Sequence, residues 1–389
     1  MGQARVAGVG STEFGEFPNR TGRELFAEAS SVALEDAGVP RADVEALYYG
    51  NFMGEIAERQ GHQGPLMADA AGVVGAETTR IESACASAGF AAAEGVRALR
   101  SGDVDVVLVG GMERMNNLET AETTDALARA ADELYEVRAG MTFPGAYALM
   151  AQSYFHQYGG SREDLAAVAV KNHANAVENP TAQFQFEITE EKVLGAPIVA
   201  EPLGLYDACP ITDGASAAVL VSEEYAAEQG LDPSVAITGS GRGSDSLALQ
   251  DRPAIARTEA ATEAAERAYG DAGIAVDDVD LAEVHDCFTI AEVLAIESLG
   301  LFEPGEGITA AREGLTTRDG DVPVNLSGGL KAKGHPVGAT GVSQIVELTE
   351  LLEGDHPNAD AVPDATVGVT HNAGGTVASV AVHVLEVVA

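Results

Sequence analysis

The sequence predicts an α/β protein made of two similar halves. Residues 36–52, DAGVPRADVEALYYGNF, align with residues 271–288, DAGIAVDDVDLAEVHDCF, once one residue is inserted. Residues 83–111 and 334–375 form a second pair, each running from small residues through a helix and an acidic turn to a strand. Strands such as VDVVLVG are nearly all apolar, which is typical of a sheet covered by helices on both faces. The shared signature favours duplication over chance similarity.

The first elements of each half are a helix and a strand. Helix-like patterns cover 24–36 and 260–271, and each is followed by Asp-Val and an apolar strand. The copies are about 235 residues apart, more than half the chain, so we predict halves at 1–235 and 236–389.

The second pair of segments supplies one more helix and strand to each half. The strands end in Gly110-Gly111 and in Gly374-Gly375. If the halves are related by pseudo-symmetry, the starts of the two helices should face one another near the centre of the molecule. Residues from about 116 to 200 have less strand character and much of the aromatic content, so we expect an insertion in the first half. Either a lid that faces substrate or a helical oligomerisation insert fits this stretch.

The charge is extreme, with 61 acidic against 22 basic residues and a net charge of −39. Long apolar strands argue against disorder. A salt-rich cytoplasm explains the charge better, because carboxylates keep a protein soluble and molar salt shortens the Debye length to about 3 Å. A nucleic-acid partner would need a basic face and is not expected.

The sequence favours a reducing, cytoplasmic location. Its three cysteines are widely spaced, which argues against a disulfide scaffold or a cysteine-rich zinc site. No apolar run reaches the roughly 20 residues that span a bilayer, and the first residues lack a secretion signal, so no membrane partner is expected.

Cys85 is the candidate nucleophile. It lies where small residues lead into a predicted helix, and the helix N-terminus should lower the pKa of its thiol. A lone cysteine beside alanines is usually a core residue, but His335 precedes the matching helix of the other half, and a nearby imidazole can deprotonate a thiol. The loop around His335 lacks the Gly-Lys-Ser/Thr ending of a nucleotide loop.

Further candidates follow strands of the second half. His285, Asp286 and Cys287 come after the repeated strand, at the carboxyl end where α/β sheets build sites. His-x-Cys could bind a metal, but no cysteine cluster completes a tetrahedral site, so no metal is expected. His371 ends the strand TVGVT, and the glycines after it could offer N–H groups to an oxyanion.

Six motifs together resemble those of thiolases, in the family's order and across nearly the whole chain: SACASAGFAA (83–92), GGMERM (110–115), CPITDGASAAVL (209–220), HDCF (285–288), GGLKAKGHPVGATG (328–341) and HNAGG (371–375). The resemblance implies the thiolase fold, with two βαβαβ halves in five alternating layers (αβαβα) and a loop domain inserted in the first half.

Two departures indicate a branch of that family. The commonest thiolases carry NEAF in place of HDCF, and Cys-x-Gly where this chain has His371-Asn372-Ala373. Both departures resemble the sterol-carrier-protein type and many archaeal thiolases, in which HDCF supplies the second catalytic cysteine. The resemblance therefore makes Cys287 the acid/base, leaves the role of His371 open, and makes Cys209 structural, although Cys209 is a competing candidate.

The resemblance implies an acetyl-CoA C-acetyltransferase, with coenzyme A thioesters as substrates and no bound cofactor. Cys85 would accept an acyl group, and a second acetyl-CoA would lose a methyl proton to Cys287 and attack that group. His335 would activate Cys85 and, with His285, stabilise the enolate. The backbone N–H groups that would hold the other oxyanion are those of Cys85, Ala373 and Gly374. Either high salt or nearby cations would offset the charge of CoA; the candidate cations are Lys331, Lys333, Arg242 and Arg252.

The resemblance also implies a homodimer or homotetramer, and permits a complex with a zinc-ribbon/OB-fold companion and a hydroxymethylglutaryl-CoA synthase. A longer-chain 3-ketoacyl-CoA thiolase and a ketoacyl synthase remain alternatives, although ketoacyl synthases carry His-Gly-Thr where this chain has His285-Asp286-Cys287. A non-enzymatic alternative is an inactive subunit that binds acyl-CoA.

Overall fold

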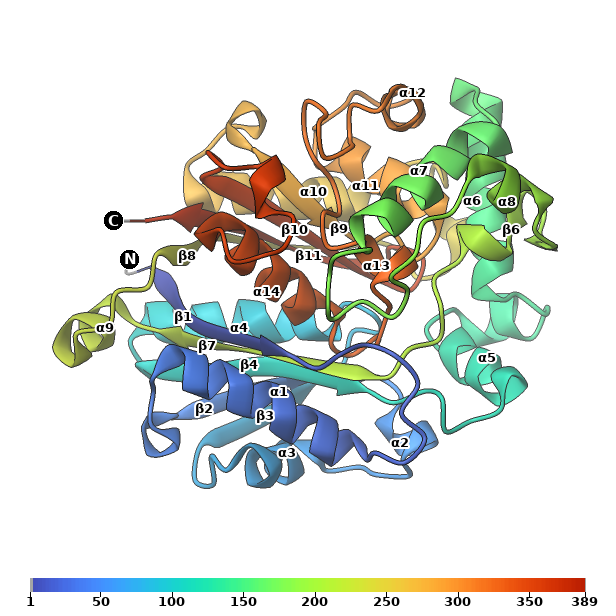
Figure 1. The fold of residues 1–389 in the computed structure, drawn as a ribbon. Coiled ribbons are helices and arrows are strands. Elements are labelled where there is room, and N and C mark those ends of the chain that lie inside the picture. Colours follow the sequence, from blue (N-terminus) through green and yellow to red (C-terminus); the bar gives the residue numbers. More distant parts are fainter. Residues whose placement is uncertain (1–2, 389) are drawn as a thin grey trace.

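The computed structural model describes residues 3–388. Its centre is one series of nine strands in the order β3-β2-β4-β7-β1-β8-β11-β10-β9 (Figure 1). The strands are β1 (Ala4–Ser11), β2 (Ala46–Gly50), β3 (Glu77–Ile81), β4 (Val106–Glu113), β7 (Gly214–Val221), β8 (Val235–Ser244), β9 (Leu281–Val284), β10 (Val367–Gly374) and β11 (Ser379–Val387).

From the central pair β1 and β8 outward, the strands of the two sides follow the same order of antiparallel and parallel neighbours. β1 and β8 meet through three residue pairs, Ala4 to Val6 against Val235 to Ile237. On one side follow antiparallel β7, then β4, with β2 and β3 parallel to it. On the other side follow antiparallel β11, then β10, with β9 parallel to it. A parallel bridge from Ala282 to Val324 takes the place of β3. The structure thus confirms the two similar halves.

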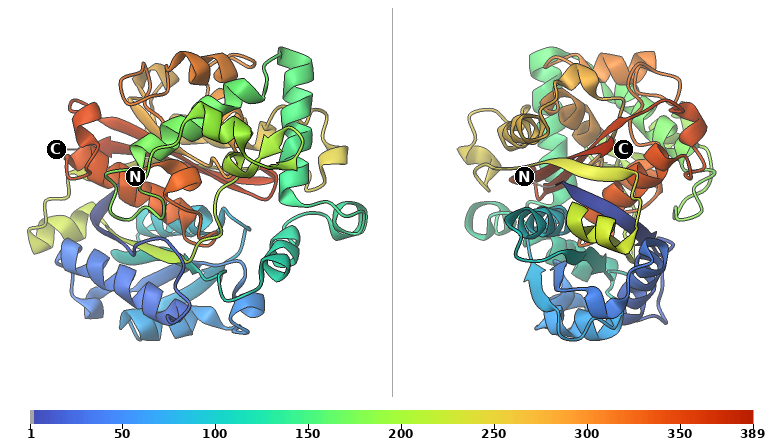
Figure 2. Two further views of the ribbon diagram at one scale, coloured as in Figure 1. Left: turned by 45° about the vertical axis from the view of Figure 1, so that its right-hand side comes forward. Right: turned by 90° about the vertical axis from the view of Figure 1, so that its left-hand side faces the viewer.

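Helices complete five layers (Figures 1 and 2). α1 (Gly22–Ala37) and α3 (Gln63–Ala71) cover the outer face of the first half, and α10 (Glu259–Ala272) and α11 (Thr289–Ser298) cover that of the second. α4 (Ser87–Ser101) and α14 (Thr340–Glu353) pack against each other between the strands of the first half and those of the second. The predicted αβαβα order is therefore confirmed.

The repeated DAG signature ends the outer helices α1 and α10. Gly38 and Gly273 follow these helices with φ of 64° and 78°, left-handed values that glycine adopts at little cost. A 3₁₀ turn follows each glycine, η1 (Arg41–Asp43) and η5 (Val276–Asp278), and then a buried valine leads into the strand. The sequence repeat is therefore a repeated helix-to-strand connection.

The insertion lies between β4 and β7, on the right of Figure 1. It contains α5 (Thr120–Ala128), the π-helix η2 (Glu133–Val137), α6 (Phe143–Tyr158), α7 (Arg162–Asn175), α8 (Glu190–Gly195), β5 (Ile198–Ala200), β6 (Leu203–Gly204) and η3 (Leu205–Asp207). α6 and α7 both pack against α11, so the insertion lies over the second half.

The remaining elements are short: α2 (Gly54–Ala57), α9 (Glu223–Gln229), η4 (Leu249–Asp251), α12 (Gly307–Glu313), α13 (Gly329–Ala332) and η6 (Ala359–Ala361). Within residues 3–388, no helix combines the length and apolar character that crossing a membrane requires.

Candidate active site

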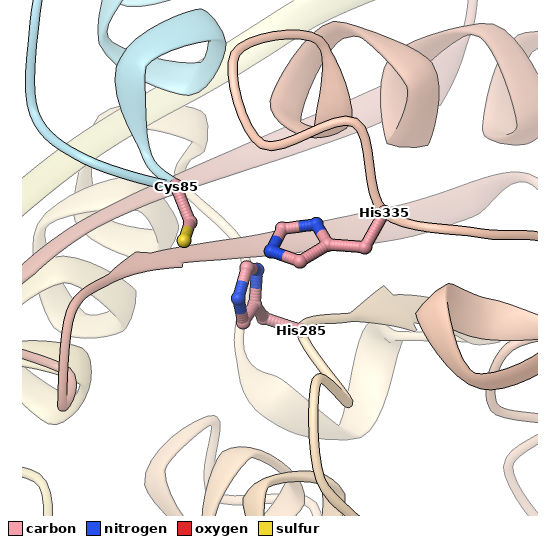
Figure 3. Close-up of side chains that lie close together, drawn as sticks. All are labelled: Cys85, His285 and His335. Carbon is pink, nitrogen blue, oxygen red and sulfur yellow. The ribbon is translucent and has the colours of Figure 1, made fainter. Parts of the chain in front are cut away.

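Cys85, His285 and His335 come from both halves and meet at one point (Figure 3). The thiol and one ring nitrogen of each histidine all lie within 4.8 Å of one another. The two imidazoles are edge to face, with 4.9 Å between ring centroids. This spacing suits proton transfer between thiol and imidazole, and it would also suit a shared metal ion. The hydrogen bonds of the two rings distinguish these uses.

A strained turn presents Cys85 just before α4. Ala84 has φ of 49°, a left-handed value that is uncommon outside glycine. The Ser87 hydroxyl donates to the Ala84 carbonyl at 2.6 Å, and the Ala84 N–H donates to Glu82 Oε1 at 2.7 Å. These bonds hold the turn, so the sulfur projects beyond the helix start.

Glycines bring His335 close to the first half. The carbonyl oxygen of Gly338, three residues after His335, lies against the ends of β2 and β4. A Cβ on Gly111 would overlap that oxygen, and one on Gly50 would lie 2.8 Å from it. The small residues at these strand ends therefore let the HPVG turn of the second half approach the first.

His335 has a free lone pair on Nε2. Thr340 Oγ1 donates its single proton to the Pro336 carbonyl at 3.1 Å, so it accepts from His335 Nδ1 at 2.7 Å. The hydrogen bonds thus assign the proton of His335 to Nδ1. Nε2 is buried and has no hydrogen-bond partner among the described residues, which makes it a ready proton acceptor.

His285 has the opposite tautomer, set by Asn372. Asn372 Oδ1 accepts from Gly89 N–H at 3.2 Å, and Nδ2 donates to the Cys85 carbonyl at 3.0 Å, which fixes the amide orientation. The second Nδ2 proton points at His285 Nδ1, 3.3 Å away, so His285 carries its proton on Nε2. His285 Nε2 is therefore a hydrogen-bond donor. A metal ion on Nε2 would need a lone pair there, which would move the proton to Nδ1 and set it against the Asn372 Nδ2 donor.

Cys85 and the histidines rest in their neutral forms. Burial, with the nearby Cys209, raises the pKa of the Cys85 thiol to about 12, so the expected lowering by the helix N-terminus is wrong. The reason is that α4 begins at Ser87, beyond Cys85, and burial disfavours the charged thiolate. Burial lowers the pKa of His335 to about 3, and burial with neighbouring His335 and His371 lowers the pKa of His285 far below its usual value.

The other two cysteines lie beside this centre. Cys287 is buried with its thiol beside the Tyr147 hydroxyl, and its backbone carbonyl accepts from Cys209 N–H at 3.0 Å. Burial and then Cys209 raise the pKa of the Cys287 thiol, with Cys85 as a further nearby contributor. Burial also raises the pKa of Cys209 to about 12, against the opposing charge of Lys331.

His371 lies next to this centre. Its Nδ1 accepts from the backbone N–H of His285 at 3.5 Å, while its Nε2 is buried and without a hydrogen-bond partner among the described residues. Ala373 and Gly374 end β10. The backbone of the next residue, Gly375, lies beside the Cys85 sulfur, and the role of Ala373 and Gly374 at an oxyanion stays a prediction.

Asp286 fastens the loop that carries His335. Its carboxylate accepts from Leu330 N–H at 2.6 Å, Lys331 N–H at 3.3 Å and Asn172 Nδ2 at 2.7 Å. The HDCF strand end is thereby tied to α13, which ends three residues before His335.

Three of the four proposed CoA-binding cations need correction. Lys331 is 1% exposed and donates to the Ala208 carbonyl, and Lys333 is 3% exposed and pairs with Glu347. The buried Arg252 guanidinium donates to the Thr376 carbonyl at 2.5 Å. These groups serve internal partners, which gives them no access to a bound phosphate.

Arg242 is different. It pairs with Glu94 and lies over the Phe90 ring, at a surface cavity of about 510 Å³ that Arg97 and Arg100 also line. Its contact with CoA stays a prediction.

Sequence reasoning missed Asn372, Thr340 and Tyr147. Asn372 stands in HNAGG beside His371, but strand alternation turns the two side chains to opposite faces. Thr340 follows the GHP turn by four residues, a spacing that fits one helical turn. Tyr147 belongs to the insertion, and no sequence signal places it beside Cys287.

Comparisons with known proteins extend these observations. Residues 4–224 match the family model "Thiolase, N-terminal domain", and residues 241–387 match "Thiolase C-terminal domain-like". The acetyl-CoA acetyltransferase of Methanothermobacter thermautotrophicus is 44% identical over 386 residues, which cover 99% of this chain and 100% of that protein. Sterol carrier protein 2 of Homo sapiens is 31% identical over 383 residues, 95% of this chain and 69% of that protein.

A solved structure, "Ltp2-ChsH2(DUF35) aldolase", matches with a TM-score of 0.85 and 26% identity, over 99% of this chain and 98% of that one.

Proposed function

The chain belongs to the thiolase family, and we propose that it is an acetyl-CoA C-acetyltransferase. It condenses two acetyl-CoA molecules to acetoacetyl-CoA and CoA, and it catalyses the reverse thiolysis. A relative that matches over its full length at 44% identity has that name. The single observation that carries the proposal is the pair of opposite tautomers beside one thiol: a lone pair on His335 and an N–H on His285.

In the first half-reaction Cys85 takes the acetyl group. His335 Nε2 removes the thiol proton as the sulfur attacks the thioester carbonyl, since the neutral resting pair holds no thiolate beforehand. Backbone N–H groups near Cys85 and the end of β10 stabilise the oxyanion. The C–S bond to CoA breaks, and the leaving thiolate takes a proton from Cys287. The acyl-enzyme then holds a Cys287 thiolate and a His335 imidazolium.

In the second half-reaction a new carbon–carbon bond forms. The Cys287 thiolate removes a methyl proton from a second acetyl-CoA, whose enolate oxygen is held by the N–H groups of His285 and protonated His335. The carbanion attacks acetyl-Cys85, and the C–S bond to Cys85 breaks. His335 returns its proton to the Cys85 thiolate, which restores every group to its starting form.

Coenzyme A thioesters are the substrates, and high salt is part of the proposal. CoA is anionic and the protein has a net charge of −39. Three of the four lysines are buried, so any cation that meets CoA at the surface is almost always an arginine, and acidic residues outnumber basic ones by 61 to 22. Screening by molar salt offsets the repulsion.

Homo-oligomers, a companion protein and a reducing cytoplasm complete the proposal. The matching solved structure names a second component, ChsH2(DUF35), which supports a companion subunit here. Cys85, Cys209 and Cys287 are free thiols, in keeping with a reducing compartment.

The proposal is tested by assaying condensation and thiolysis in molar KCl. We expect CoA release from acetyl-CoA alone, and thiolysis that is fastest for acetoacetyl-CoA. A faster reaction with longer 3-ketoacyl-CoA would move the assignment to a longer-chain thiolase. Transfer only from acyl carrier protein would indicate a ketoacyl synthase. Binding of acyl-CoA without turnover would indicate a scaffold subunit.

A further inference from the structure

Tyr147 is a polar group of the insertion that reaches the reaction centre. It lies on α6 and is fully buried. Its ring stacks on Phe288, the last residue of HDCF, with 4.7 Å between centroids and 25° between planes. The stack fixes the ring, so the hydroxyl has a defined position.

That hydroxyl links the two reactive cysteines. It donates to the Gly375 carbonyl at 3.0 Å, and it lies beside the Cys287 thiol. The backbone of Gly375 in turn lies beside the Cys85 sulfur. Because the Tyr147 proton is donated to the Gly375 carbonyl, the hydroxyl gives no proton to the resting Cys287 thiol. The neutral Tyr147 hydroxyl therefore lies beside the thiol that must become a thiolate during the reaction.

The reaction requires that charge to persist. Between the half-reactions Cys287 is a thiolate, although burial and neighbouring Cys209 raise the pKa of this thiol. The other charged or titratable groups near the two side chains are Cys85, Asp286 and Arg252. A donated O–H bond compensates for lost hydration of a buried anion.

We propose that Tyr147 is a catalytic residue: in the acyl-enzyme its O–H turns from the Gly375 carbonyl and donates to the Cys287 thiolate. No proton leaves the tyrosine, since the hydroxyl only rotates. The bond stabilises the base that removes the methyl proton of acetyl-CoA. This inference rests on the proposed thiolase function.

The test compares Tyr147→Phe with Tyr154→Phe. Both tyrosines are buried on α6, but the Tyr154 hydroxyl bonds to Glu297, away from the cysteines. We expect Tyr147→Phe to slow condensation and exchange of acetyl-CoA methyl protons with deuterated solvent by roughly 10- to 100-fold, the size expected for a hydrogen bond to a charged group. As the pH is lowered, Tyr147→Phe should lose activity at a higher pH than the wild type does, because its Cys287 thiolate is protonated more easily. Tyr154→Phe should change neither.

Unchanged exchange in Tyr147→Phe would overturn the inference, and so would a loss equal in both variants or a loss without a shift in the pH profile. Absence of condensation in wild type would instead overturn the proposed function. If Tyr147→Phe unfolds, Tyr147→3-fluorotyrosine replaces it. Its more acidic hydroxyl should move the profile towards lower pH, and no movement would count against the role.

Discussion

At the scale of single residues, the protonation of the centre follows from two neutral side chains. Thr340 and Asn372 have no charge, yet they assign opposite tautomers to His335 and His285. The sequence identified the cysteine and both histidines from their place after strands and before helices. It could not identify their partners, because a hydroxyl or amide acquires such a role only through a contact between distant segments.

Reactivity of Cys85 should rise with pH. Burial raises the pKa of its thiol and lowers that of His335, so the resting pair is thiol and imidazole, and thiolate forms only as pH increases. Alkylation of Cys85 by iodoacetamide, followed by peptide mass spectrometry from pH 6 to pH 9, should accelerate throughout this roughly three-unit range. A rate independent of pH would indicate a preformed thiolate and imidazolium.

Asn372→Asp should impair condensation through His285. An aspartate accepts rather than donates, which moves the His285 proton to Nδ1 and removes the Nε2–H donor. The loss of one oxyanion donor costs about 10²- to 10³-fold in kcat, and we expect a fall of that order with little change in KM. Normal kcat in this variant would show that the His285 tautomer has no part in catalysis.

At the scale of elements, glycines decide how closely the two helices of the middle layer approach. A Cβ on Gly341, in the first turn of α14, would overlap the Gly89 N–H of α4. The repeat predicted that these helices face one another, since each follows the matching strand of its half. Their spacing could not be predicted, because the sequence does not show which glycines touch.

Gly341→Ala should therefore push α14 from α4. Overpacking in a close-packed interior costs about 1–3 kcal/mol, so the midpoint of thermal unfolding and condensation activity should both fall. Gly270→Ala in α10 is the matched control, as a Cβ there meets nothing within 4 Å. It should stabilise the exposed helix by about 0.5–1 kcal/mol. Equal effects of the two variants would contradict this account of the helix contact.

At the scale of the whole molecule, charge sets the conditions in which the fold persists. The net charge of −39 was evident from the sequence, and the structure adds that Lys171, Lys331 and Lys333 lie inside. Lys171 pairs with Glu292 at 2.9 Å, and Lys333 pairs with Glu347. Their burial escaped prediction because neither a lysine in a helix, as Lys171 is, nor one in a glycine-rich loop, as Lys333 is, shows in the sequence which carboxylate it pairs with.

The protein should require salt for stability. Surface carboxylates repel one another, and raising KCl from about 0.1 M to several molar shortens the Debye length from about 10 Å to about 3 Å or less. The unfolding midpoint should rise over that titration, and KM for acetyl-CoA should fall with it. Constant values of both would remove salt adaptation from the account.

The central claim is that Cys85 carries the acyl group and Cys287 supplies the base, and Cys287→Ser tests both parts directly. After incubation with acetyl-CoA in molar KCl, peptide mass spectrometry should find one acetyl group on the peptide that contains Cys85, and no acetoacetyl-CoA should form. Condensation at the wild-type rate, or an acetyl group on Cys209 with none on Cys85, would contradict the account.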